Sequence, residues 1–265
     1  MLDAEAIRSL AGWPAQDGAI RVLGSVSSTS DIAWAWAGAG CPQWTVVLAE
    51  EQVQGRGRFG RTWVCPRGGG VLMSVVLRPP SQLVGPAHLM ALGALAVAEA
   101  VAESGPEARI RWPNDVVAGG RKLAGVLVES RARRASPVYV LGVGLNVNVA
   151  REDFPQALQG RATSVAIETG RQVPREPLAG QVLRHLRHRY DQARGGHWAR
   201  VADAWRRRSS LVGQTVELES RGSPVYGRVV QADPLAGIEL ELPGGIRRRF
   251  RAEHTTLVSP KLQDP

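Results

Sequence analysis

Cysteine, lysine and long apolar runs are scarce in this chain of 265 residues, and each scarcity excludes a class of protein. The two cysteines, Cys41 and Cys65, are far apart and follow no metal-ligand spacing, so neither a disulfide framework nor a zinc motif is predicted. The most apolar window, residues 86–102, contains His88 and Glu99 and is already short for a bilayer. The N-terminus also lacks the apolar run of a secretory signal. We therefore expect a cytoplasmic protein without a membrane partner, in which residues 86–102 form a buried helix.

Lysine is nearly absent although the chain is strongly basic. The 33 basic residues are 31 arginines and two lysines, and the formal net charge is +9. Such a charge indicates anionic partners, namely nucleotides, nucleic acid or acidic protein surfaces, and does not choose among them. Lys261 lies close to the C-terminal end, which leaves Lys122 as the one lysine in the body of the chain. Lys122 is therefore a candidate for a function that arginine performs poorly.

The chain does contain a regular succession of strand and helix patterns. Its apolar fraction of 44% and charged fraction of 22% are those of an ordinary globular protein. Short β-rich or alternating runs predict strands at residues 20–26, 44–49, 71–79 and 138–149. Helices are predicted from about residue 30 to 39, over 86–103 and, in two parts broken at Gly195-Gly196, over 176–208. Gly119-Gly120 between two β-rich runs predicts a tight hairpin, with Lys122 just past its turn.

The last part of the chain has a different period. Residues 211–258 contain short alternating strands separated by turns with glycine and proline, such as Pro243-Gly244-Gly245, and they predict a small β-barrel. We therefore predict an α+β fold with two domains. Residues 1–209 are expected to form a central mixed β-sheet flanked by helices, and residues 210–265 the barrel.

The strand predicted at 138–149 has two different faces. Its odd positions from 139 to 149 are all apolar, whereas its even positions from 142 to 148 carry two glycines and two asparagines. One face is expected to join the core, and the other leaves room for a ligand close to amide side chains. A solvent-exposed face with glycines at bulges is the alternative that the pattern leaves open.

The loop Gly55 to Trp63, GRGRFGRTW, has the composition of an anion-binding segment. Its glycines allow backbone N–H groups to approach anionic oxygens, and its arginines can form bidentate hydrogen bonds to phosphate or carboxylate. It is not a Walker loop, because no Gly-Lys-Ser/Thr follows, and its glycine spacing is not that of a dinucleotide site. The loop therefore suits a phosphate, although a flexible RNA-binding loop would have the same composition.

Several polar residues could converge on this loop. Residues 28–30, Ser-Thr-Ser, offer hydroxyls that can bond both the donors and the acceptors of a neutral cyclic urea or amide. Helix capping is an equally good interpretation, and the two are compatible. Gln52 lies just before the loop, and Asn114-Asp115 follow a Trp-Pro pair in a predicted turn, which alone carries little information.

Four motifs, SSTSD, EEQVQGRGRFGRTW, RWPNDVVAGGRKLAGVLVE and GVGLNVN, follow one another between about Ser25 and Val149. In these motifs the chain resembles the biotin-protein ligases, also called biotin–[acetyl-CoA-carboxylase] ligases. The resemblance implies a class II synthetase-like catalytic domain and an SH3-like C-terminal barrel. Only 26 residues precede SSTSD, so we expect a short form without the N-terminal DNA-binding domain of some members, and no specific DNA partner.

The resemblance also implies a two-step reaction. The biotin carboxylate attacks the α-phosphorus of Mg-ATP, which gives biotinyl-5′-AMP and pyrophosphate. A specific lysine of a biotin carrier domain, in acetyl-CoA carboxylase or a related carboxylase, then takes the biotinyl group and AMP leaves. Biotin and ATP are thus the implied substrates and Mg²⁺ the implied cofactor.

Site residues follow from the matched motif positions. Lys122 and Arg58 are the expected catalytic residues. The expected biotin-binding residues are Ser28, Thr29, Ser30, Gln52, Gly55, Arg56, Gly57, Arg58, Lys122 and Gly125. The expected ATP-binding residues are Arg58, Arg61, Trp63, Asn114, Lys122 and Asn146, with Asp115 as the expected Mg²⁺ ligand. The chain departs from the family at Ser30, where Asn is frequent, and at Arg111, where Lys is frequent.

Two alternatives accompany this interpretation. Lipoate ligases share the fold and the adenylation chemistry, but they would lack the combination of GRGR with Trp-Pro-Asn-Asp. A nucleic-acid-binding module is suggested by the arginine runs that start at residues 131, 206 and 247, although charge runs usually form solvated faces. The sequence does not determine the oligomeric state, and a homodimer is left open.

Overall fold

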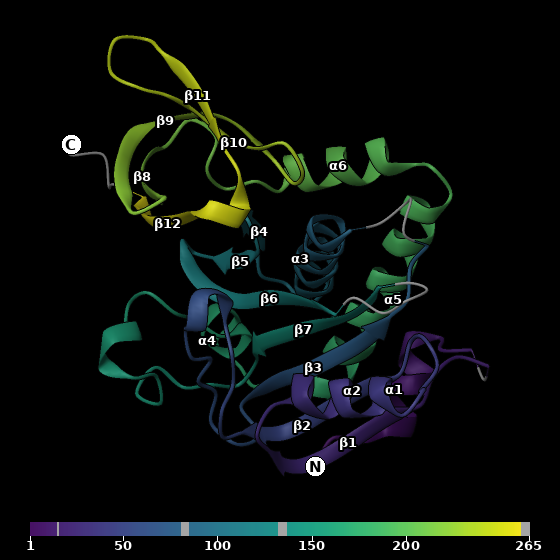
Figure 1. The fold of residues 1–265 in the computed structure, drawn as a ribbon. Helices are drawn as coiled ribbons and strands as arrows, with labels where there is room; N and C mark the ends of the chain where they lie inside the picture. The colour runs from purple at the N-terminus through teal and green to yellow at the C-terminus, as the bar shows by residue number, and fades with distance from the viewer. Residues whose placement is uncertain (15, 81–84, 132–136, 261–265) are drawn as a thin grey trace.

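The computed structural model describes residues 1–260 apart from residues 15, 81–84 and 132–136, and within these residues the strands form two sheets. The larger, seven-stranded sheet has the order β1-β2-β3-β7-β6-β5-β4 (Figure 1). Its strands are β1 (Ile20–Val26), β2 (Val46–Gln52), β3 (Gly70–Leu77), β4 (Arg109–Arg111), β5 (Asp115–Ala118), β6 (Arg121–Arg131) and β7 (Val138–Asn146). Strands β1 and β2 are parallel and the other neighbours antiparallel, so the predicted mixed sheet is confirmed.

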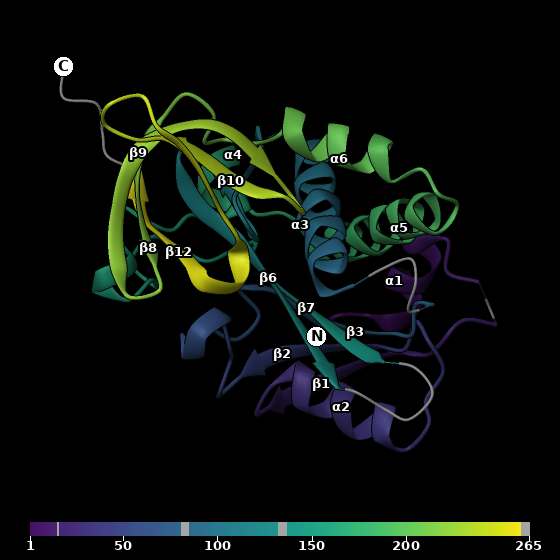
Figure 2. The ribbon, with the colours of Figure 1, turned by 45° about the horizontal axis from the view of Figure 1, so that its top comes forward.

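Helices cover both faces of this sheet. They are α1 (Ala4–Ala11), α2 (Thr29–Gly38), α3 (Pro86–Glu103), α4 (Val165–Thr169), α5 (Arg175–Arg194) and α6 (Trp198–Arg207), with short 3₁₀ turns η1 (Arg58–Gly60), η2 (Gln156–Leu158) and η3 (Ala252–His254). Helix α2 packs on one face, over Val47, Val76 and Val140. Helices α1, α3 and α5 pack on the other face (Figure 2), where they form the main core.

Helix α3 is a core helix, as its sequence predicted. Among the described helices it is the one long and apolar enough to cross a membrane, with a mean hydropathy of 1.2, yet 67% of that window is buried within the protein. A side chain at Gly93 would place its Cβ 2.8 Å from Cγ1 of Val126, so this glycine allows the helix to approach β6 closely. The apolarity of α3 therefore reflects packing on the sheet.

The two faces of β7 differ in the way its sequence predicted. Tyr139, Leu141, Val143 and Leu145 join the main core, and the even residues start under α2. The even positions from 142 to 146 lie on the same face but are buried or half-buried by other segments. The solvent-exposed alternative is thus wrong, and this stretch of β7 forms part of the site described below.

The C-terminal strands form a separate five-stranded antiparallel sheet of order β11-β10-β9-β8-β12, drawn in green and yellow in Figure 2. They are β8 (Thr215–Ser220), β9 (Ser223–Asp233), β10 (Gly237–Glu241), β11 (Arg247–Phe250) and β12 (Thr255–Pro260). No pairing joins β11 to β12 in the described residues, so the hydrogen-bonded sheet is open. Ile110 of β4 bonds Arg208 and Ser210, which ties the start of this region to the larger sheet.

A buried ion pair anchors the N-terminus to the larger sheet. Glu50, 5% exposed, accepts hydrogen bonds from the Leu2 amide at 2.5 Å and from Arg175 at 2.9 Å. Burial by itself raises the pKa of Glu50, but the bonds from Leu2 and Arg175 outweigh burial and leave the pKa below its ordinary value. The ionised carboxylate therefore stabilises the fold at neutral pH, and this contribution is lost as the pH falls through the lowered pKa.

Replacement of Glu50 by glutamine is expected to lower the free energy of unfolding by about 1–3 kcal/mol at pH 7, because charge-assisted hydrogen bonds are lost. At about pH 3, where the carboxyl is protonated in the unfolded chain, the difference from the unsubstituted protein should shrink. Urea unfolding at both pH values measures the difference in free energy of unfolding between Glu50→Gln and the unsubstituted protein. An equal difference at the two values would show that the charge of Glu50 is not what stabilises this contact.

Candidate active site

The sequence-predicted residues come from five segments that meet at one site on the larger sheet. These segments are the start of α2, the end of β2 with the loop that follows it, the turn from β4 into β5, the start of β6 and the end of β7. Side chains from these segments approach one another, as the contacts below show. The structure therefore brings most of the predicted residues together, next to the start of α2 and over the paired strands β6 and β7.

A buried cluster of hydroxyl and amide groups lies at the start of α2. Ser28 caps the helix through a 3.3 Å bond from the Ser30 amide, so the capping interpretation is confirmed. The side-chain oxygen Oε1 of Gln52 accepts from the Thr29 amide at 2.7 Å and from the Thr29 hydroxyl at 2.9 Å. Ser74 Oγ lies 2.8 Å from the Thr29 hydroxyl and 3.1 Å from the Ser30 hydroxyl. The cluster can thus offer several donors and acceptors to one neutral polar group.

Sequence reasoning missed Ser74, although one signal was available. Ser74 is fully buried in β3, where it is the single polar residue of an otherwise apolar strand. A buried hydroxyl needs a hydrogen-bond partner, so a lone serine in such a strand indicates a polar neighbour on the same face. That neighbour is the start of α2.

The loop of residues 55–63 closes on itself as a hairpin. The Gly57 amide donates to the Arg61 carbonyl at 2.6 Å, and the Trp63 amide donates to the Gly55 carbonyl at 2.9 Å. A Cβ atom at Gly55 would lie 2.5 Å from the Trp63 carbonyl oxygen, so only glycine allows this closure. In this structure the loop is therefore a closed hairpin, with Arg61 exposed near its tip.

Arg56 fastens the hairpin to the rest of the domain. Its guanidinium lies 2.7 Å from Asp31 of α2 and 3.5 Å from Glu129 of β6. Burial alone would lower the pKa of Arg56, but these two carboxylates outweigh burial and raise it. A cavity of about 520 Å³ adjoins this contact and is lined by Asp31, Trp34, Arg56, Glu129, Ser130 and Arg131. In this structure Arg56 anchors the loop.

Arg58 connects the hairpin to both sheets. Its guanidinium donates to Asn114 Oδ1 at 3.3 Å and to the carbonyl oxygen of Ala252, in the turn η3 between β11 and β12, at 2.5 Å. Burial lowers the pKa of Arg58, and the nearby Asp115 carboxylate opposes this effect. An arginine stays charged even so, and a poorly hydrated guanidinium binds an incoming anion strongly.

Trp63 occupies the glycine-rich face that β6 and β7 share. A Cβ atom at Gly144 would lie 2.5 Å from the Trp63 ring, and one at Gly125 would lie 3.3 Å from it. Lys122 Nζ lies 5.6 Å from the centroid of the ring. Gly144 and Gly125 therefore make room for the indole. At Gly144 the space that was expected to be left for a ligand is thus taken by Trp63 in this structure. The indole becomes a wall of the site.

A β-bulge turns Lys122 toward this wall. On β5, Val116 pairs with Ala124 and Val117 with Lys122, so Leu123 has no partner and is the extra residue. Leu123 and Ala124 both face the core. Because side chains of a regular strand alternate, the extra residue places Lys122 on the face of Gly125, where an added Cβ atom would lie 3.5 Å from the lysine chain.

Lys122 forms an ion pair with Asp115. Its Nζ lies 2.7 Å from Asp115 Oδ1, and Arg111 lies 3.3 Å from the other carboxylate oxygen. Asp115 is therefore held between two cations. Among the described residues no group of three or more His, Cys, Asp and Glu side chains could hold a metal ion. These donors fit a resident Mg²⁺ ion poorly, because the one candidate carboxylate is already paired.

Asn114 and Asn146 are both buried at the site. Asn114 donates to the Val126 carbonyl at 2.7 Å and accepts from Arg58. Asn146 donates to the Thr163 carbonyl at 3.0 Å, and its amide oxygen has no hydrogen-bond partner among the described residues. A buried acceptor without a partner is a position at which a ligand donor can bind.

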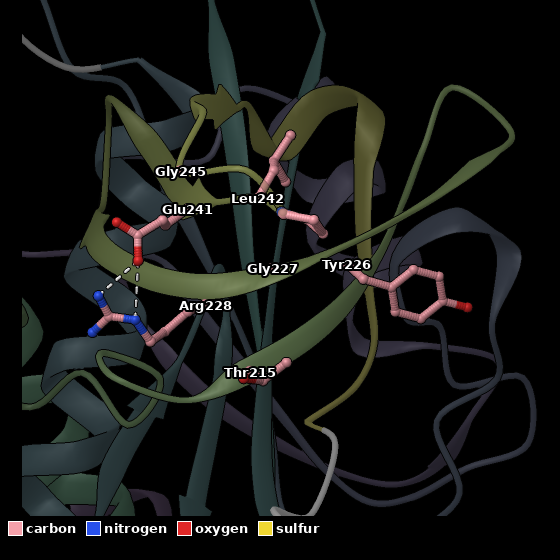
Figure 3. Close-up of a pocket in the computed structure, with 8 residues that line it drawn as sticks. Thr215, Tyr226, Gly227, Arg228, Glu241, Leu242 and Gly245 are labelled. Atoms are coloured by element: carbon pink, nitrogen blue, oxygen red, sulfur yellow. Dashed lines mark hydrogen bonds and ion pairs between the residues drawn. The ribbon is translucent and has the colours of Figure 1, made fainter.

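A groove of about 360 Å³ on the second sheet is separate from this site. It is lined by Thr215, Tyr226, Gly227, Arg228, Glu241, Leu242, Pro243 and Gly245. In Figure 3 Arg228 and Glu241 are joined by hydrogen bonds, and the Tyr226 ring points away from them. None of the predicted substrate-binding residues lines the groove.

Comparison with known proteins places the chain among ligases. The model of the Biotin/lipoate A/B protein ligase family matches residues 22–146. The chain is 37% identical over 241 residues to the biotin–[acetyl-CoA-carboxylase] ligase of Mycobacterium tuberculosis, covering 88% of this chain and 85% of that one. It is 34% identical over 205 residues to the enzyme of the same name from Paracoccus denitrificans, covering 75% and 85%.

Solved structures share the fold. The biotin protein ligase of Aquifex aeolicus in complex with biotin and ATP superposes with a TM-score of 0.77 at 24% identity, covering 91% of this chain and 98% of that one. The same protein without ligand gives a TM-score of 0.74 at 21% identity, with 90% and 97% covered. This likeness includes both sheets, since nearly the whole of each chain is matched.

Proposed function

Because the chain belongs to the biotin protein ligases within the biotin/lipoate A/B protein ligase family, we propose that it joins biotin to a carrier protein in two steps. ATP first converts biotin to biotinyl-5′-AMP, and a lysine of a biotin carrier domain then receives the biotinyl group. The acceptor that we propose is acetyl-CoA carboxylase or a related carboxylase. The observation that carries the proposal is the line of groups along one face of β7: Gly144 faces the Trp63 ring beside Lys122, and Gly142 faces the Ser30 hydroxyl of the polar cluster.

The cluster of Ser28, Thr29, Ser30, Gln52 and Ser74 is suited to the ureido ring of biotin. A cyclic urea is neutral and carries both N–H donors and a carbonyl acceptor, which hydroxyl groups can satisfy in either direction. The fully buried Ser74 and the nearly buried residues 28–30 would exclude water from the ring. We propose that Gly55, Gly57 and Gly125 let the backbone and the indole approach the bound biotin.

In the first step a carboxylate oxygen of biotin bonds to the α-phosphorus of ATP, and the bond from that phosphorus to the bridging oxygen breaks, so pyrophosphate leaves. Negative charge moves from the carboxylate to the phosphoryl oxygens during this displacement. The compact, mobile ammonium of Lys122 can follow that charge. We propose that Arg58, Arg61, Trp63, Asn114 and Asn146 hold the nucleotide.

Mg²⁺ is proposed to enter as part of Mg-ATP, as a companion of the substrate. Phosphate oxygens and waters commonly supply most ligands of Mg²⁺ in such complexes, with one or two carboxylates from the protein. Asp115 would be the carboxylate closest to it, and its ion pair with Lys122 would then have to open.

For the second sheet we propose a distinct SH3-like C-terminal domain, with the boundary between residues 209 and 210. Five short strands and their order support a small barrel-like module, although the pairing is open between β11 and β12. The contact between Arg58 and Ala252 supports a role at the rim of the active site. A cytoplasmic location is part of the proposal and agrees with two free cysteines, Cys41 and Cys65.

The experiment that tests the function is exchange of labelled pyrophosphate into ATP, measured with biotin, with lipoate and without acid. Exchange with biotin alone supports the proposal. Exchange with lipoate would favour the lipoate ligases of the same family. That result is not expected, because the dithiolane ring of lipoate offers no hydrogen-bond donors to the polar cluster. Absence of exchange with either acid would contradict the proposed first step.

The nucleic-acid alternative is weakened by ion pairs along the arginine runs. Arg206 pairs with Asp203 and Asp233. On β11, Arg249 lies 2.5 Å from Glu239. The run that starts at Arg131 continues outside the described residues, at 132–136. Part of this charge is therefore neutralised by neighbours.

Replacement of Arg58 by alanine is expected to release biotinyl-5′-AMP about tenfold faster, since the hairpin loses its bonds to Asn114 and Ala252 and the intermediate loses a cation. Chromatography of free biotinyl-5′-AMP, formed without an acceptor, measures the release. Arg67→Ala serves as the control, because Arg67 is exposed and pairs loosely with Glu51 at 3.7 Å. Equal release by the two variants would refute a retaining role for Arg58.

A further inference from the structure

Glu168 of α4 lies behind the catalytic lysine. Its side chain is 14% exposed, and one carboxylate oxygen accepts from Arg121 at 2.8 Å and from the Thr163 hydroxyl at 2.5 Å. Arg121 directly precedes Lys122 on β6. Glu168 therefore touches the chain on one side of Lys122 without approaching the ammonium itself.

Thr163 extends this contact to the other side. It is fully buried, its amide donates to the Lys122 carbonyl at 2.8 Å, and its own carbonyl accepts from Asn146 at 3.0 Å. The Lys122 amide donates to the Arg161 carbonyl at 2.8 Å. Both backbone groups of Lys122 are thus bonded to the segment of residues 161–163. Glu168 fixes this segment through its hydrogen bond from the Thr163 hydroxyl.

The turn before Lys122 also rests on Glu168. A Cβ atom at Gly119 would lie 3.1 Å from the second carboxylate oxygen, so the carboxylate packs directly beneath the turn. Gly119 and Gly120 have φ values of +53° and +73°, which a two-residue hairpin of this hand requires. One carboxylate therefore contacts the turn, the residue before Lys122 and the segment beside it.

We propose that Glu168 is a positioning residue that sets the direction of the Lys122 side chain and the place of Asn146 during adenylate formation. The inference rests on the proposed function, because it assigns Glu168 to the same reaction. Lys122 lies on the short stretch between a tight turn and a bulge, and its backbone N–H and C=O groups bond to residues 161–163, so this segment fixes its position. A displacement of about 1 Å at a catalytic group can lower a rate about 100-fold, so such a brace has a kinetic effect.

The test is kinetic and uses the full chain. Glu168→Ala is expected to lower the kcat of biotin-dependent pyrophosphate exchange about tenfold or more, with less than about twofold change in KM for biotin. Glu168→Gln should restore most of the rate, since its amide oxygen can accept from Thr163 and Arg121. Unchanged kcat in Glu168→Ala, or equal loss of kcat in both variants, would overturn the proposal.

A second substitution removes the same contact with less disturbance. Thr163→Val keeps the volume of the side chain and loses only its hydroxyl. If Glu168 acts through Thr163, the double variant should be no slower than Glu168→Ala alone. Multiplied losses in the double variant would contradict this route. If Glu168→Ala folds poorly, Thr163→Val alone should still lower kcat, and an unchanged kcat in it would also contradict the route.

A control separates positioning from general stability. Glu99 pairs with Arg189 between α3 and α5, with 9% and 17% of the side chains exposed, away from the site. Glu99→Ala is expected to lower the melting temperature while kcat stays within about twofold. Absence of pyrophosphate exchange in the unsubstituted protein would refute the proposed function itself. Normal exchange in both the unsubstituted protein and Glu168→Ala would refute only the positioning role of Glu168.

Discussion

Replacement of Lys122 by alanine is expected to lower biotin-dependent pyrophosphate exchange about 100-fold or more, which corresponds to about 2.7 kcal/mol of transition-state stabilisation. The ammonium lies in a half-buried place beside the Trp63 ring, where a charge acts more strongly than in water. Removal also leaves Asp115 with Arg111 as its remaining cation. The carboxylate would then repel the incoming acid and phosphate. Initial rates at saturating biotin and ATP measure the effect.

Lys122→Arg provides the informative comparison. It keeps the positive charge but exchanges a compact ammonium for a rigid planar fork, so it is expected to recover less than about a tenth of the rate. Circular dichroism and melting curves should show all three proteins folded, because Lys122 is half-buried and not part of the core. Near-normal exchange by Lys122→Ala would remove this residue from the catalytic assignment.

Replacement of Gly144 by alanine is expected to lower the free energy of unfolding by about 1–3 kcal/mol, because the new methyl group would collide with the Trp63 ring. The indole must move to relieve the collision, and it forms a wall of the site. We therefore expect the KM for ATP to rise together with the loss of stability. Urea unfolding and exchange kinetics on the same preparations measure the two effects.

Two further variants identify the collision as the cause. Gly142→Ala is the matched control on the same strand and face, since its Cβ would lie at an ordinary 3.4 Å from Ser30 Oγ. In a background that already carries Trp63→Ala, the change Gly144→Ala should cost less than about 0.5 kcal/mol. If Gly142→Ala and Gly144→Ala lower the free energy of unfolding equally, the collision with the Trp63 ring is not the cause of the destabilisation.

The sequence predicted those parts of the molecule that depend on local period. Alternation along residues 138–149 identified the core face of β7, and Gly119-Gly120 identified the hairpin that precedes Lys122. Helix α3 was predicted with its observed bounds, because a long apolar segment follows Pro86, a residue that suits the first turn of a helix. The hydroxyl cap at the start of α2 also agreed with expectation.

Contacts between distant segments could not be predicted in this way. The bulge at Leu123 adds one residue to β6, so Lys122 faces the opposite side of the sheet from the one that regular alternation predicts. The sequence gives no sign of the bulge, because Leu123 is one apolar residue among several. Trp63 fills a face that glycines alone suggested was empty, because a sequence shows missing side chains but not their neighbours. Glu168 belongs to a segment without any motif. Its importance comes from the two residues it contacts, 5 and 47 positions away.

The bond between Arg58 and Ala252 has a consequence for synthesis of the enzyme on the ribosome. The two residues are 194 positions apart, so the hairpin emerges long before the carbonyl that it binds. At the usual rates of elongation, roughly 10–40 s separate their appearance. A nascent chain could fold its larger sheet in that interval while its loop still lacks one attachment. Biotinyl-5′-AMP would be held firmly only by chains whose translation has nearly finished, and prematurely terminated chains would release it.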